Sequence, residues 1–225
     1  MHRRNSAPHL AFWLAFAVFG AIGCQSSQDS PSAVEAAASL PVDTAALGPA
    51  APVYSDPPYI DVNLSVDQAY AAIPHHRTIW QESDSTATPE EKAYLHVIFP
   101  LVDEAVALRV AAWQAYSRGD FDSFDLNAQY DRLITFVRST RPPDSLQFFH
   151  QRVATAISSD HLFFRDWNSN RADFPYAQHV QTHPAVQTAS RSAHYAYDAL
   201  LRQFPHEPPA NRQAFYDYFC ALDFL

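Results

Sequence analysis

The chain has 225 residues, a formal net charge of −9 and 17% charged residues. Its 15 Lys and Arg residues are scattered, without the basic stripe that binds phosphates, so we expect no nucleic-acid partner. Only four glycines occur, and neither a Gly-rich phosphate loop nor a G-x-S-x-G elbow is present. These absences exclude dinucleotide-binding folds, P-loop enzymes and serine hydrolases of the elbow type.

The first 24 residues have the organisation of a secretory signal. Arg3 and Arg4 precede an uncharged apolar run over residues 10–22, which is shorter than the roughly 20 residues of a membrane-spanning helix. The run ends in the sequence Ala21-Ile22-Gly23-Cys24. This sequence resembles the lipobox of bacterial lipoproteins, although Ala21 stands where that family usually has Leu.

The resemblance implies that the signal peptide, residues 1–23, is removed and that Cys24 is acylated. The lipid bilayer is then a partner of the protein, because two or three acyl chains anchor a protein stably. Gln25, in place of Asp, follows the cysteine, which by the same resemblance implies the periplasmic side of the bacterial outer membrane. The alternative is an ordinary signal peptide that is cut elsewhere, for instance after residues 36–38. With lipid on Cys24, Cys220 has no disulfide partner.

The composition then divides the mature chain into two parts. Residues 25–60 are mainly Ser, Ala and Pro, and cannot bury enough apolar surface to offset the entropy of ordering them. We therefore expect an acylated cysteine and a disordered tether over residues 24–60, followed by one domain over residues 61–225. Without Arg3 and Arg4 the mature chain has 13 basic and 24 acidic residues, a formal charge of −11 with His neutral.

The domain is predicted to be all-α. It contains a single glycine, Gly119, so the positive-φ turns of β-hairpins are unsupported. Capping boxes begin a short helix at Ser65 and a long one at Thr88. Apolar residues at 3–4 spacing predict further helices that start at Asp122 or Asp125, at about Asp144, at 182–184 and after 208–209. We expect an antiparallel helical bundle of four to five long helices plus short helices.

Three histidines suggest one candidate site. His150 and His161 lie on one face of the helix predicted over 144–167, and His194 flanks the apolar stripe of the following helix. Facing helices could bring them together with Asp160 or Asp166, which would make a metal- or haem-binding bundle. In the other interpretation these histidines lie at the edge of the core, bonded to backbone or Tyr hydroxyls, with lowered pKa values, and no cofactor is bound.

A second candidate site is the predicted loop after Pro74. His75, His76 and Arg77 could form a small pocket for an anion or a carboxylate, which is the basis of an enzymatic alternative. Otherwise the loop is held over the bundle by Ile73 and Trp80, with Arg77 in a structural ion pair. Arg77 has no acidic neighbour nearer than Glu82 in the sequence, so we expect its partner to come from elsewhere.

Taken together, the sequence favours an outer-membrane-anchored periplasmic lipoprotein whose helical domain binds or scaffolds a partner without catalysis. That partner is an unidentified periplasmic protein or a small ligand. The metal- or haem-binding bundle and the enzyme remain the two alternatives.

Overall fold

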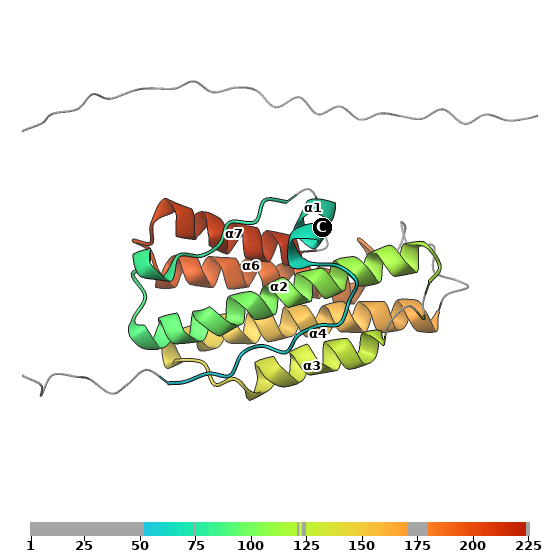
Figure 1. Cartoon of the computed structure of the whole chain (residues 1–225), viewed down its shortest axis with the longest axis horizontal. Helices are drawn as coiled ribbons and strands as arrows, with labels where there is room; N and C mark the ends of the chain where they lie inside the picture. Colours follow the sequence, from blue (N-terminus) through green and yellow to red (C-terminus); the bar gives the residue numbers. More distant parts are fainter. Residues whose placement is uncertain (1–51, 74, 121, 123–124, 171–179, 224–225) are drawn as a thin grey trace, which may run out of the picture. The chain divides into compact units, whose positions relative to one another are not determined.

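The computed structural model describes residues 52–73, 75–120, 122, 125–170 and 180–223 (Figure 1). The predicted signal peptide, Cys24 and the tether up to residue 51 lie outside the described residues. All described residues belong to one compact unit, Leu47–Leu225. Within them the regular structure is entirely helical, which confirms the all-α prediction.

Six α-helices and two short 3₁₀-helices occur among the described residues: α1 Val66–Ala72, η2 Glu82–Asp84, α2 Pro89–Ser117, α3 Leu126–Ser139, η3 Asp144–Leu146, α4 Gln147–Ser169, α6 Pro184–Gln203 and α7 Pro209–Leu222. Five of the α-helices have 14 residues or more. Successive long helices run in alternate directions in Figure 1, so they form the expected antiparallel bundle.

The helix boundaries follow the capping signals in the sequence. The Ser65 and Thr88 side chains each accept a hydrogen bond from the backbone three residues later, and both capping boxes are complete. Asp125 caps α3 through Ala128 N at 3.0 Å. Gly119, just past the end of α2, has a φ of +76°, a conformation that L side chains rarely adopt. The local predictions for these helix ends are therefore confirmed.

The core is built around α2 and the aromatic side chains that face it. Helix α2 buries residues around most of its circumference, so it lacks the single apolar stripe of a surface helix. Phe99 of α2 stacks on Tyr218 of α7 with ring centroids 4.5 Å apart. The most extensive helix pairing is between α4 and α6. In the described part of the chain, no helix combines the length and apolar character needed to span a bilayer.

The described chain begins with an extended segment that packs on the bundle. Tyr54 donates its hydroxyl to the Arg141 carbonyl at 3.1 Å, and its ring meets Tyr94 edge-on at 5.8 Å. Ile60 is only 1% exposed, and its backbone N donates to Glu104 at 3.3 Å. Tyr54 and Ile60, which the sequence assigned to the end of the tether, therefore contact the helical domain.

Candidate functional site

The loop predicted after Pro74 is the start of a longer segment, residues 75–88, that we call the strap. It connects α1 to α2 and runs beside α7 in Figure 1, with only the short η2 helix inside it. A segment of this kind has few hydrogen bonds of its own, yet backbone N–H groups removed from water must be paired. Side-chain oxygens of α7 and of the α6–α7 turn supply those partners.

Two of these acceptors lie on α7. Thr78 N donates to Asp217 Oδ2 at 3.0 Å. Gln81 N donates to Asn211 Oδ1 at 2.7 Å, and Asn211 Nδ2 returns a hydrogen bond to the Gln81 carbonyl at 2.9 Å. Asp217 is 3% exposed and Asn211 is fully buried. These polar residues of α7 therefore hold the strap and do not face solvent.

A third acceptor, Glu207, lies in the turn between α6 and α7. Its Oε2 accepts both the backbone N and the hydroxyl of Thr86, at 2.8 and 2.7 Å. Its Oε1 accepts from Asn211 at 2.8 Å and from the indole N–H of Trp80 at 3.4 Å. Burial alone would raise the pKa of Glu207, but hydrogen bonds from Ser85, Thr86 and Asn211 outweigh it and lower that pKa. The carboxylate is thus held ionised.

The side chain of Arg77, also in the strap, is held by two carboxylates. Its Nη2 bonds Asp103 Oδ2 of α2, and its Nη1 bonds Asp67 Oδ1 of α1 at 2.8 Å. The Tyr70 hydroxyl donates to the other Asp103 oxygen at 2.9 Å. The expectation that Arg77 pairs with a distant acid is confirmed, and its charge is already neutralised within the domain.

The three residues of the proposed anion pocket have different neighbours. Arg77 faces the carboxylates just described, whereas His76 is exposed. His75 places its Nε2 3.5 Å from Cys220 Sγ. Arg77 is thus already paired with carboxylates, and the geometry gives no support to a common anion site for the three residues.

The histidines of the proposed metal site are also separated. His150 Nδ1 lies 2.8 Å from the Tyr94 hydroxyl. His161 Nε2 lies 2.9 Å from Asn127 Oδ1, and its ring stacks on Tyr130. His161 follows His150 by eleven positions along α4, an axial rise of about 16.5 Å at about 1.5 Å per residue, so they cannot share one ion.

His194 is not at the edge of the core, contrary to expectation. Its side chain is 67% exposed, and its Nε2 lies 3.0 Å from Oδ2 of the largely buried Asp223. In the described residues, no group of three or more His, Cys, Asp or Glu side chains is arranged to hold a metal ion. The geometry thus gives no support to a common site for His150, His161 and His194.

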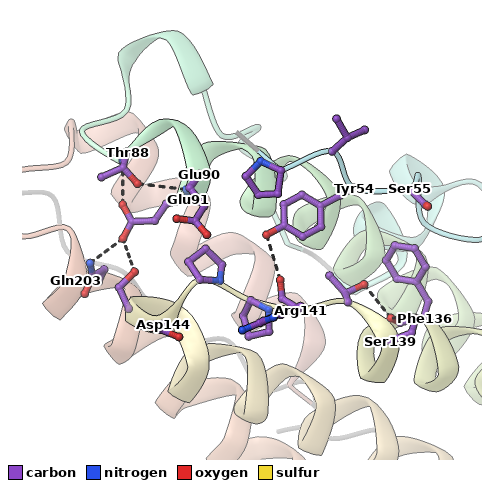
Figure 2. Close-up of a pocket in the computed structure, with 16 residues that line it drawn as sticks. Tyr54, Ser55, Thr88, Glu90, Glu91, Phe136, Ser139, Arg141, Asp144 and Gln203 are labelled. Atoms are coloured by element: carbon purple, nitrogen blue, oxygen red, sulfur yellow. Dashed lines mark hydrogen bonds between the residues drawn. The ribbon is translucent and has the colours of Figure 1, made fainter. Parts of the chain in front are cut away.

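One large concave feature among the described residues is not indicated by the sequence. We call it the N-terminal groove, a cavity of about 1040 Å³ where the first described residues meet the α2 start, the end of α3 and the 140–145 loop (Figure 2). Tyr54 and Phe136 supply aromatic surface, while Glu90, Arg141 and Asp144 supply charge. These residues come from segments far apart in the chain, so no local motif could reveal them.

The floor of the N-terminal groove is held in place by a buried carboxylate, Glu91. Its Oε1 accepts from Ser145 at 2.7 Å and from Gln203 at 2.8 Å, while its Oε2 accepts from Thr88 N at 2.9 Å (Figure 2). Burial opposes ionisation of Glu91, but these hydrogen bonds prevail and lower its pKa. The exposed charged residues of the groove are Glu90, Arg141 and Asp144.

The half-buried histidines generate a pH prediction. Burial lowers the pKa of His150, and it also lowers the pKa of His161, where Asp131 opposes the shift. A group with a depressed folded pKa binds fewer protons in the folded state, so its contribution to stability falls as pH drops below about 6.5. Buried Asp160 acts in the opposite direction, because burial raises its pKa and acid then favours the folded state.

We therefore compare variants with the wild-type chain at two pH values. The loss of Tm between about pH 7.5 and about pH 5 should be smaller by roughly 1–4 °C in His161→Gln and in His150→Gln. The matched control is His76→Gln, which changes an exposed imidazole and should leave the loss as it is. An unchanged loss in both buried-site variants would contradict the prediction, as would an equal reduction in the control.

Comparison with known proteins adds no identification to this geometry. No family model, no curated protein and no solved structure matches the chain. The functional inference therefore depends on the residues and contacts described above.

Proposed function

We propose that this protein is a lipoprotein of the bacterial outer membrane, anchored on the periplasmic side by acylated Cys24, with a non-catalytic helical domain that binds a partner. The observation that carries the anchor is the short apolar run over residues 10–22, which ends directly at Gly23-Cys24. The described helices form a compact domain downstream of that cysteine, which suits a tethered binding module.

The N-terminal groove supports the binding part of the proposal. It has room for a peptide segment or a small ligand, and its aromatic residues provide contact area beside charged ones. The charge of the mature chain, −11, and the exposed carboxylates Glu90 and Asp144 favour a partner with positive charge. Arg141 adds one place where a partner's carboxylate would be bound.

The strap argues against the enzymatic alternative. Asp103, Glu207 and Asp217, which could otherwise serve as general acids or bases, are all engaged in hydrogen bonds that hold the strap. A proton-transfer group must be able to reach a substrate. The proposal therefore places binding at the N-terminal groove and gives these three carboxylates the structural role of holding the strap.

The anchor is tested by replacing the cysteine. Cys24→Ser should move the protein from the membrane pellet to the soluble fraction, because the chain loses its acyl groups. The wild-type N-terminal peptide should begin at Cys24 and carry the mass of the acyl chains. Cys220→Ser is the matched control and should stay in the pellet. Unchanged fractionation of Cys24→Ser, with no acyl mass on the wild-type peptide, would overturn the anchor.

The groove is tested by photo-crosslinking in intact cells. A photoreactive residue at Ser139, in the groove wall, should give a discrete adduct, while one at exposed Asp198, outside the groove, should not. Because we place positive charge on the partner, Glu90→Lys combined with Asp144→Lys should abolish the adduct. An adduct that forms equally from Asp198, or that survives the charge reversal, would contradict binding in the groove.

A further inference from the structure

The outward side of α7 carries a nucleophile beside a base. Cys220, a free and partly exposed thiol, has its Sγ 3.5 Å from His75 Nε2 of the strap. The Tyr216 hydroxyl, one helical turn earlier, lies 3.4 Å from the same sulfur. A Cys and a His at this separation are the components of an activated thiol, because the imidazole can take the proton as the sulfur attacks.

A second groove adjoins this pair through Tyr216. Its volume is about 390 Å³, and it is lined by Tyr197, Pro209, Arg212, Gln213 and Tyr216. Positions 209, 212, 213 and 216 recur at helical spacing, so they share one face of α7, and Cys220 continues that face by one turn. We call the groove lined by these five residues the thiol groove.

The lining of the thiol groove defines the ligand chemistry. The rings of Tyr197 and Tyr216 meet edge-on with centroids 5.8 Å apart, and both offer apolar surface for a planar group. Arg212 adds a guanidinium, whose Nη1 uses one hydrogen bond on the Pro205 carbonyl at 3.3 Å. Its remaining N–H groups suit a carboxylate. A small anionic molecule with an apolar body matches this combination.

We propose that Cys220 is a thiol modification site at which His75 assists reaction with a small anionic disulfide bound in the thiol groove. The Cys220 sulfur attacks one sulfur of the disulfide while its proton passes to His75. A new S–S bond forms between Cys220 and the bound half, the old S–S bond breaks, and the other half leaves as a thiolate. The proton on His75 then passes to solvent, and no other oxidant is required.

This proposal is independent of the lipid anchor. It uses residues of the helical domain alone, and it can be tested on the full chain carrying Cys24→Ser, in which Cys220 is the sole thiol. The probes are two aromatic disulfides, dianionic dithiobis(nitrobenzoate) and neutral dithiodipyridine. Both report release of the leaving thiol by absorbance, so the rates at Cys220 can be compared directly.

In that background, His75→Gln should slow reaction with both reagents by about tenfold or more, because proton removal is lost. Its neighbour provides the matched control, since His76 is exposed and His76→Gln should leave both rates unchanged. Arg212→Gln should slow only the dianionic reagent, by about two- to fivefold, because only that reagent has carboxylates to bind. The ratio of the two rates thus separates binding in the groove from thiol activation.

Loss of folding is excluded by the helical circular dichroism of each variant, which should equal that of the chain carrying Cys24→Ser alone. A His75→Gln variant that reacts slowly while keeping this helical signal has lost proton removal and not its fold. Equal rates in His75→Gln and His76→Gln would overturn the role of His75. A rate ratio unaffected by Arg212→Gln would overturn the anionic ligand. Reaction of the native chain no faster than that of the urea-unfolded chain would overturn the site as a whole.

Discussion

The structure depends on how the strap, a largely non-helical segment of 14 residues (75–88), satisfies its backbone against a helical bundle. The backbone N–H and C=O groups of a helix are hydrogen-bonded to each other. A helix therefore has no free backbone group along its length that could pair with an extended segment beside it. The protein solves this with buried side-chain acceptors: Asp217, Asn211 and Glu207 each receive a strap N–H at 3.0 Å or less. Removing any one would leave a partly buried strap N–H without its acceptor, and the upper bound on the cost is that of a fully buried unpaired donor, about 1–3 kcal/mol. The last helix and the strap therefore stabilise each other, although they are far apart in the sequence.

This arrangement also determines where function can lie. From the sequence alone, these polar residues would be assigned to the surface or to a catalytic loop. In the structure their side chains form hydrogen bonds with the strap, and the charge of Arg77 is neutralised by Asp103 and Asp67. Two other places carry accessible residues that the proposals use. One is the N-terminal groove, with exposed Glu90 and Asp144, and the other is the outward face of α7. We propose partner binding at the first, and the second has a nucleophile next to a base.

Local signals in the sequence were sufficient for the helices but not for their contacts. The capping box at Thr88 and the scarcity of glycine predicted the helix start and the all-α class, because both depend on backbone chemistry within a few residues. Helical spacing correctly indicated that His150 and His161 share a helix, but it could not say which neighbours face them. Helical spacing also could not reveal that Asp217 is buried, because an isolated acidic residue in a helix is normally predicted to be exposed to solvent. Side-chain partners from distant segments carry no local pattern, which is why both grooves were missed.

The central claim is that buried side chains of α7 and the α6–α7 turn hold the strap backbone. Backbone amide hydrogen exchange at Thr78, Gln81 and Thr86 tests it most directly. If Asp217, Asn211 and Glu207 hold these N–H groups, the three amides should exchange as slowly as those in the middle of α2, although they lie in a segment that is mostly not helical. Exchange at the rate of an unstructured peptide would contradict the account, because it would mean that the strap is open to water and that its polar partners do not bind it.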